Sequence, residues 1–213
     1  MNTRKLTHLL AGATASALLL AGCGGGQETA TTTSPGAGAA SSTTAAEAEH
    51  NEADVVFAQG MIPHHRQAVA MAELAASRTD DPEVLDLAGR VGLAQEPEIE
   101  LMISWLEEWD AEVPEGTGMP GMDGGGMNHG GMDGGGMGGM MTPEQMTQLE
   151  QGSGSAFDRM FLEMMTEHHR GAIEMAQTQL AEGADPEALE LAQTIIETQR
   201  AEIEEMEQLL QQL

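Results

Sequence analysis

The 213-residue chain has very few of the residues on which several protein classes depend. Its single cysteine excludes an intrachain disulfide and a zinc site built from several thiolates. Tyrosine is absent, and aromatic residues make up only 2% of the chain. Eight basic residues stand against 35 acidic ones, a formal net charge of −27. This charge repels phosphate backbones, so nucleic acid is excluded as a partner.

No apolar run is long enough to predict a permanent membrane span. The longest one, Leu9–Leu20, is short, is rich in small residues and follows the basic pair Arg4 and Lys5. This arrangement predicts a secretory signal peptide over residues 1–22.

The end of this predicted signal peptide contains a second targeting motif. Leu-Ala-Gly-Cys resembles a bacterial lipobox, and the only cysteine, Cys23, stands where lipidation would occur. Residues 23–50 are mostly Gly, Ala, Ser and Thr, which predicts a flexible tether. The sequence therefore predicts an extracytoplasmic, bacterial, membrane-anchored lipoprotein. An ordinary signal peptide with an incidental cysteine is the alternative.

What the chain does contain is one unit written twice. Asp54–Leu106 aligns with Asp158–Leu210 without a gap, and 21 of 53 positions are identical. In each unit, apolar residues recur at helical spacing on both sides of an Asp-Pro-Glu sequence, which predicts two antiparallel helices. Neither hairpin can bury its apolar stripe alone.

The predicted fold is therefore all-α, a ferritin-like four-helix bundle of two αα-hairpins joined by a long crossover. The bundle domain is expected over residues 51–213. Its first repeat covers 54–109, its crossover 110–153 and its second repeat 154–213. A short extra helix is expected at Pro143–Leu149 inside the crossover.

Both repeats carry a Met-x-x-His-His motif on the first helix of the hairpin. On the second helix, Gln95, Glu98 and Met102 share one face, as do their counterparts in the second repeat. Two adjacent histidines cannot both be apolar packing, and their burial without partners would be costly. The predicted metal ligands of the bundle are Met61, His64, His65, Met71, Glu98, Met102, Met165, His168, His169, Met175, Glu202 and Met206. The alternative is that the methionines are core packing and the histidines are satisfied core residues.

The residue types favour a soft metal. Ferritin-like di-iron sites use Glu-x-x-His, whereas Met61 and Met165 stand three residues before the histidine pairs. A thioether in that place favours Cu(I), with Ag(I) as a chemical mimic, and imidazole keeps Cu(II) possible. Zinc is a weaker candidate because no thiolate is available.

The crossover is rich in methionine as well. Of the 24 residues of Gly118–Met141, 12 are glycine and 7 are methionine. Such a segment is expected to be mobile, and a mobile chain has no packing reason to select methionine. It is interpreted as a second, soft-metal-binding segment, although a low-complexity linker remains the alternative. Its candidate donors are Met119, Met122, Met127, His129, Met132, Met137, Met140 and Met141.

The strings DVVFAQGMIPHHRQAVAMA and QEPEIELM, with their second copies, resemble the domain-of-unknown-function family 305. That family comprises ferritin-like exported bacterial proteins, some of them associated with copper. The resemblance implies a four-helix bundle and copper handling through His64, His65, Met61 and Met102 and their partners in the second repeat. Pro63 and Pro97 depart from the second repeat, where Glu167 and Ala201 stand. Because proline kinks helices, the equivalence of the two sites is left open.

The leading functional hypothesis is a non-enzymatic copper-binding lipoprotein. It would capture, buffer or deliver copper outside the cytoplasm and contribute to copper tolerance and metal homeostasis. Its partners are metal ions and a membrane, and the sequence does not identify a delivery partner. One alternative is a ferritin-like metal oxidase, which inward-facing Glu98 and Glu202 would favour. The other is a helical partner-binding module that binds no metal.

Overall fold

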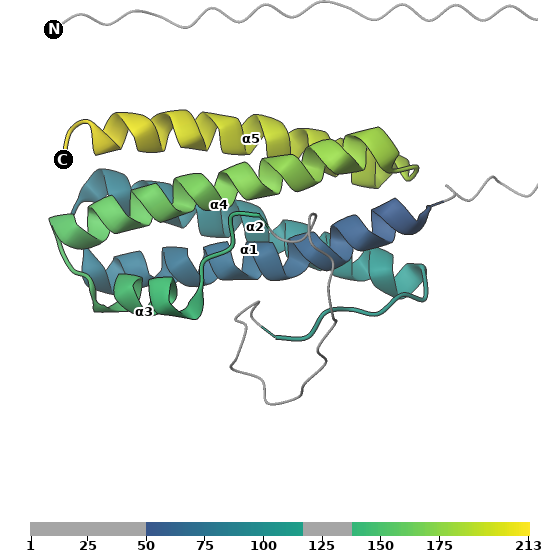
Figure 1. Ribbon diagram of the computed structural model, residues 1–213, viewed down its shortest axis with the longest axis horizontal. Coiled ribbons are helices and arrows are strands. Elements are labelled where there is room, and N and C mark those ends of the chain that lie inside the picture. Colours follow the sequence, from purple (N-terminus) through teal and green to yellow (C-terminus); the bar gives the residue numbers. More distant parts are fainter. Residues whose placement is uncertain (1–49, 117–137) are drawn as a thin grey trace, which may run out of the picture. The chain divides into compact units, whose positions relative to one another are not determined.

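A computed structural model describes residues 50–116 and 138–213 of the chain. This part of the chain is all-α, as predicted, and four long helices form a bundle of two antiparallel hairpins (Figure 1). The helices are α1 (Glu52–Arg78), α2 (Pro82–Glu108), α3 (Pro143–Gln151), α4 (Ser155–Glu182) and α5 (Pro186–Leu210). The predicted signal peptide, lipobox and nearly all of the tether lie outside the described residues. The same is true of Met119, Met122, Met127, His129, Met132 and Met137.

The turn inside each hairpin is the one that the Asp-Pro-Glu sequences predicted. Asp81 is the N-cap of α2, and its carboxylate accepts hydrogen bonds from the backbone N–H groups of Glu83 and Val84. Asp185 caps α5 in the same way. A proline follows each cap at the first helical position, where its missing N–H costs nothing. These local signals fix where both hairpins reverse.

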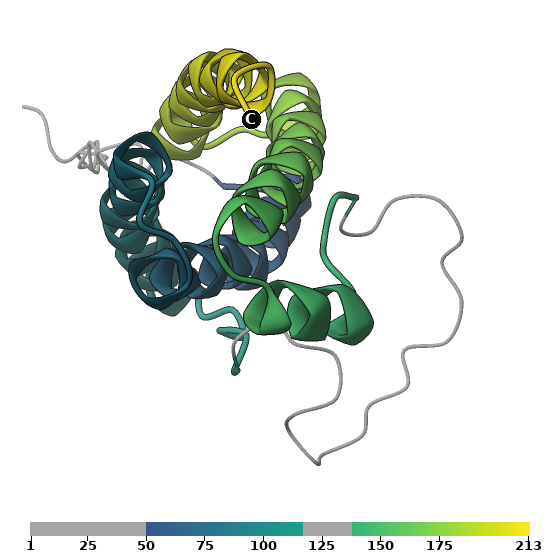
Figure 2. The same cartoon turned by 90° about the vertical axis from the view of Figure 1, so that its left-hand side faces the viewer.

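The end-on view shows how the hairpins meet. In Figure 2, α1 lies beside α2 and α4 beside α5, while α1 and α4 form the main contact between the hairpins. The short helix α3 packs against α1 and α4 from outside the bundle. It is two residues longer than predicted and is held by a capping box between Thr142 and Gln145.

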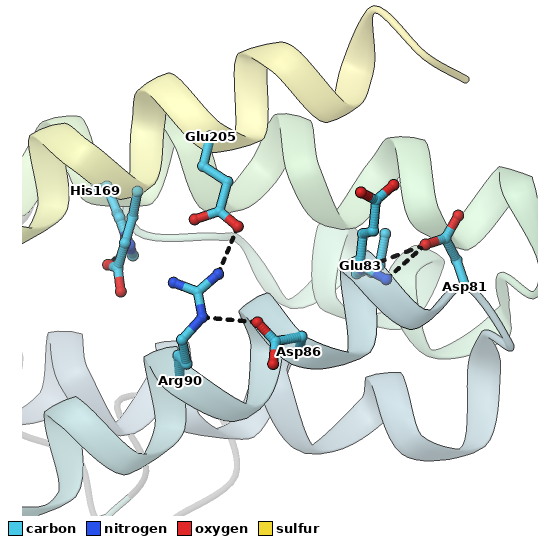
Figure 3. A network of polar contacts seen from close by, with 8 residues as sticks. Asp81, Glu83, Asp86, Arg90, His169 and Glu205 are labelled. Carbon is cyan, nitrogen blue, oxygen red and sulfur yellow. Dashed lines mark hydrogen bonds and ion pairs between the residues drawn. The ribbon is translucent and has the colours of Figure 1, made fainter. Parts of the chain in front are cut away.

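A polar link also joins α2 to α5. The guanidinium of Arg90 donates to Asp86 at 2.9 Å on its own helix and to Glu205 at 2.5 Å on α5 (Figure 3). These groups are substantially exposed, so the link contributes little to stability.

The two internal prolines do not end their helices. Pro63 lies inside α1, which continues to Arg78, and Pro97 lies inside α2, which continues to Glu108. Along the described residues, each helix is too short or too polar to cross a bilayer.

The apolar core is divided into two clusters by a polar layer. On α1, Phe57–Ile62 contributes to one cluster and Ala68–Ala75 to the other, and His64 and His65 lie between them. The other three long helices change cluster in the same way, around Gln95 and Glu98, His168 and His169, and Gln199 and Glu202. We call these eight residues the histidine layer: His64, His65, Gln95, Glu98, His168, His169, Gln199 and Glu202.

Asp54 fastens the start of α1 to the turn of the other hairpin. It is fully buried, and it accepts hydrogen bonds from the backbone N–H groups of Asn51, Ala184 and Asp185 and from the side chain of Gln179. Burial alone would raise the pKa of Asp54, but these hydrogen bonds outweigh it and lower the pKa below 3.8. The two hairpins are thus joined by one buried carboxylate as well as by apolar packing.

Candidate metal centre

The two histidine pairs meet inside the bundle. All four imidazoles are fully buried, although they come from helices more than 100 residues apart in sequence. The rings of His64 on α1 and His168 on α4 lie with centroids 3.7 Å apart, tilted by 41°. Each repeat therefore contributes half of one continuous centre, and the two predicted sites adjoin.

The second histidine of each pair contacts a carboxylate. His65 Nε2 lies 2.7 Å from Glu98 Oε2, and His169 Nε2 lies 2.8 Å from Glu202 Oε2. The two distances match although only the first repeat contains Pro63 and Pro97. The prolines thus leave the His–Glu pairs equivalent in geometry. Glu98 and Glu202 face inward, the orientation that would favour the metal-oxidase alternative.

Most of the remaining ring nitrogens have no hydrogen-bond partner within the described part of the chain. These are Nδ1 of His64, His65 and His169 and both nitrogens of His168. Both amide atoms of Gln95 and the Oε1 of Gln199 are also buried and unpartnered there. Unpartnered buried polar atoms are costly in a folded protein. Because these atoms are concentrated in one layer, the layer is the candidate site for a metal ion or a polar ligand.

The electrostatics of the layer keep the central rings neutral. Burial, with a smaller contribution from the neighbouring His65, lowers the pKa of His64 from 6.5 to about 3, although the Gly138 carbonyl opposes this. Burial and then the proximity of His64 lower the pKa of His168 well below 6.5. At neutral pH both imidazoles therefore keep a lone pair, which metal coordination requires.

Thioethers flank the layer on both sides. Met61 and Met102 are fully buried in one apolar cluster, and Met165 and Met206 are fully buried in the other. Each of them is three or four residues from a histidine or glutamate of the layer, so it is that residue's neighbour on the helix surface. The hydroxyl of Thr166 contacts the Met206 sulfur at 3.8 Å. Imidazole nitrogen and thioether sulfur together suit soft or borderline metals such as copper.

Among the described residues, imidazole, thiolate and carboxylate groups do not by themselves form a complete metal site. Within the described ranges, no group of three or more His, Cys, Asp or Glu side chains converges in a geometry that could hold a metal ion. A bundle site that binds a metal would need further donors, and the neighbouring methionines are candidates for them. The interpretation of Met61 and Met165 as replacements for the glutamate of a di-iron motif stays a prediction.

Two predicted ligands lie further along their helices. Met71 is buried in an apolar cluster with Leu87 and Val91, and it is about 10 Å along α1 from His64. Met175 lines a groove of about 850 Å³ at the start of α1, where its sulfur faces Gly60. Apolar packing accounts for both placements without a metal.

Both ends of the crossover are fastened beside the histidines. The Arg66 guanidinium donates to the carbonyls of Pro114 at 2.6 Å and Gly116 at 2.9 Å. The Gln67 amide exchanges two hydrogen bonds with the backbone of Met141, at 2.7 and 3.0 Å. Met141 thus differs from the expected mobile donor, because its side chain is buried in the core. The two described ends of the crossover therefore lie next to the candidate metal centre.

Neither Arg66 nor Gln67 was among the predicted site residues. The sequence feature that could have identified Gln67 is a difference between the repeats: the equivalent position in the second repeat is Gly171. The crossover passes so close to Gly171 that an added Cβ would lie 1.7 Å from the Gly138 carbonyl oxygen. One repeat thus provides a side chain that binds the crossover, and the other provides the space through which it passes.

Replacing Gly171 with alanine is expected to push the crossover away from α4 and to lower the free energy of unfolding by about 1–3 kcal/mol. The matched control is Gly89→Ala in α2, where nothing lies within 4 Å of the added Cβ. That variant should gain up to about 1 kcal/mol from helix propensity. Urea unfolding of both proteins measures the difference, and equal stability of the two variants would contradict the close approach.

The metal-free protein is expected to lose stability as the pH falls from about 6.5 towards 3. His64 and His168 stay neutral in the folded state but bind protons in the unfolded state below pH 6.5. Their contribution is complete above that value and falls by up to about 1.4 kcal/mol per pH unit for each ring below it. Urea midpoints at pH 7 and pH 5 test this, and a variant with glutamine at both positions should show a smaller decrease.

Comparison with known proteins finds a family model and solved structures that match this chain. A family model described as domain of unknown function (DUF305) matches residues 54–210, more than half of the chain. A DUF305 protein from Streptomyces coelicolor is 34% identical with a TM-score of 0.63, over 75% of this chain and 93% of its own. A DUF305 fragment from Deinococcus radiodurans is 29% identical with a TM-score of 0.64, over 76% of this chain and 98% of its own.

The protein CopM, solved in a Cu(II)-bound form, is 34% identical with a TM-score of 0.58. The match covers 75% of this chain and 96% of CopM, which has also been solved with Cu(I) and with Ag. An uncharacterised protein of Acanthamoeba polyphaga mimivirus is 40% identical over 55 residues, which are 26% of this chain and 36% of the viral one. The chain thus spans about a third of the length of that curated relative. On these matches, the chain belongs to the DUF305 family.

Proposed function

We propose that the chain is a non-enzymatic, extracytoplasmic copper-binding lipoprotein that captures, buffers or delivers copper and so contributes to copper tolerance. The observation that carries the proposal is the histidine layer: four buried imidazoles with unpartnered nitrogens, flanked by two pairs of buried thioethers. The copper- and silver-bound forms of CopM support the same class of ion. The thioethers favour Cu(I) as the bound state.

The inward orientation of Glu98 and Glu202 also fits the second candidate, a ferritin-like metal oxidase. Each carboxylate, however, is already engaged with one histidine, and the methionines replace the hard ligands that such an enzyme needs. Binding without turnover is therefore the function we propose for the bundle.

The test is a Cu(I) titration of the tag-free chain from Gly24 to Leu213 against a competing Cu(I) chelator. We expect at least one ion to be retained under competition. Complete loss of copper to a weak chelator would refute the proposal and favour a helical partner-binding module. A steady consumption of O₂ by the copper-loaded protein, beyond one turnover, would instead favour the oxidase.

The methionines of the crossover are proposed as a second and weaker set of copper donors. Serine at Met119, Met122, Met127, Met132 and Met137 should lower the number of Cu(I) ions bound and spare the tightest one. Met141 is left unchanged because its side chain belongs to the core. Loss of the tightest ion in this variant would place the main site in the crossover.

Cys23→Ala is expected to release the protein from the membrane, because Cys23 is the only residue that a lipobox could modify. The variant is expressed with its signal peptide intact, and the cells are fractionated into membrane and soluble parts. The parent should be found with the membrane and the variant in the soluble extracytoplasmic fraction. Equal membrane association of the two proteins would refute lipid anchoring.

A further inference from the structure

We propose that Glu98 and Glu202 are positioning residues rather than metal ligands. Each holds one imidazole, His65 or His169, with its Nε2 proton on the carboxylate and its Nδ1 lone pair free to bind the metal. The sequence predicted both glutamates as ligands, so this assigns them a different role. The inference rests on the proposed copper function for the identity of the ion, but the position of the protons can be measured without any metal.

The hydrogen bonds decide which nitrogen carries the proton. A carboxylate oxygen only accepts, so an imidazole nitrogen 2.7 or 2.8 Å away must be the donor. In both rings the other nitrogen, Nδ1, is buried and has no partner among the described residues. A proton placed on Nδ1 would be a buried donor without an acceptor, which is costly. Nδ1 is therefore the nitrogen that keeps the lone pair.

The same arrangement occurs twice at equivalent positions. Glu98 follows Pro97, whereas Glu202 follows Ala201, and the glutamate side chains are 18% and 8% exposed. The surroundings differ, yet the atoms in contact and their separation are the same. A contact that survives these differences is a property of the site rather than an accident of local packing.

The backbone provides a third case. His64 Nε2 lies 3.3 Å from the carbonyl oxygen of Gly138, and that oxygen also only accepts. His64 Nδ1 is again buried and unpartnered within the described ranges. Three of the four imidazoles thus share one tautomer, each with its Nε2–H engaged and its Nδ1 free.

This arrangement explains why carboxylates stand beside a soft-metal site. An imidazole that donates to a carboxylate is fixed in orientation and becomes a stronger donor to a metal through its other nitrogen. Loss of such a partner commonly lowers metal affinity 10- to 100-fold.

The first experiment uses the metal-free chain from Gly24 to Leu213, labelled with ¹⁵N in its histidine rings. Two-bond ¹H–¹⁵N correlation spectra distinguish the protonated nitrogen from the unprotonated one in each ring. We expect His65 and His169 to be Nε2–H tautomers. A proton on Nδ1 in both rings would overturn the assignment, whether or not the protein binds copper.

The second experiment uses Ag(I) as the probe ion. Binding should change the ¹⁵N shift of Nδ1 in His65 and His169. Glu98→Ala with Glu202→Ala should lower Ag(I) affinity 10- to 100-fold. Glu98→Gln with Glu202→Gln should keep most of the affinity, because the amide oxygen still accepts from Nε2–H. The matched control is Glu100→Ala with Glu204→Ala, which removes the same charge from exposed positions two residues further along each helix.

The outcomes separate the two roles. If Glu98 and Glu202 were ligands, glutamine would weaken binding as much as alanine does, and that result would overturn the proposal. A metal-induced shift at Nε2 would do the same. A parent protein that binds no Ag(I) or Cu(I) would refute the proposed function and the donor assignment together, while the proton positions would still stand or fall on the metal-free spectra. If the alanine variant does not fold, the folded glutamine variant and the tautomers of its histidines still test the proposal.

Discussion

Glutamine at His64, His65, His168 and His169 is expected to abolish the rise in Tm that copper produces. The parent should gain about 2.7 kcal/mol of stability when free Cu(I) is 100 times the Kd, and the variant should gain nothing. The reason is that all four rings lie in one layer and are the proposed nitrogen donors to the copper ion. Without copper, the variant should differ from the parent by only about 1–2 kcal/mol, because apolar clusters on both sides hold the bundle.

The measurement is the Tm of both proteins with and without Cu(I). Met71→Leu is the matched control, since Met71 packs in an apolar cluster further along the same helix as His64. It should keep the full copper-induced rise, whereas a reduced rise would return Met71 to the set of ligands. An unchanged rise in the quadruple histidine variant would remove the histidines from the site. A quadruple variant that fails to fold without copper would show that their role is structural.

The second large effect is a loss of folding stability on substitution of Asp54, which is not a candidate metal ligand. Asp54→Asn should lower the free energy of unfolding by about 3 kcal/mol. The new amide would turn an N–H₂ group towards backbone N–H donors of Ala184 and Asp185 that need an acceptor. One end of the bundle would then lose the bond between α1 and the turn of the other hairpin.

The second repeat provides the control for this change. Asp158 is equivalent to Asp54 and is also buried, but its Oδ1 has no hydrogen-bond partner in the described chain. At the turn of the first hairpin, the hydroxyl of Thr79 binds the backbone N–H of Asp81 instead. Asp158→Asn should therefore cost about 1 kcal/mol or less. Urea unfolding of both metal-free variants at pH 7 tests the difference, and equal losses would contradict the unequal roles.

Local signals in the sequence predicted much of the fold. The Asp-Pro-Glu turns cap their helices as expected, since a cap depends only on residues three positions apart. The repeat predicted two hairpins, and α3 was predicted within two residues. Helical spacing also placed Glu98 and Glu202 on the same side as the methionines, where the structure finds them facing the histidines.

Features that depend on how the hairpins dock could not be predicted in the same way. The spacing of residues along α1 shows which of them share a face of that helix. It does not show which residues of α4 pack against that face. The contact between His64 and His168 therefore required the structure. Gln67 was missed for a related reason, because its partner is a backbone 74 residues away in a segment with no periodic pattern. Met141 shows that membership of a glycine-rich sequence does not decide the position of a single side chain.

The meeting of His64 with His168 at matching positions is what two separate copies of one hairpin would generate across a two-fold axis. The chain thus has the arrangement of a homodimer of two identical hairpins whose subunits are joined by a connecting segment. In such a dimer every position must satisfy both subunits at once. Fusion removes that requirement, and position 67 with its counterpart 171 shows the result. One repeat carries the glutamine that binds the connecting segment, and the other carries the glycine that leaves space for it. Two identical subunits could not differ at this position.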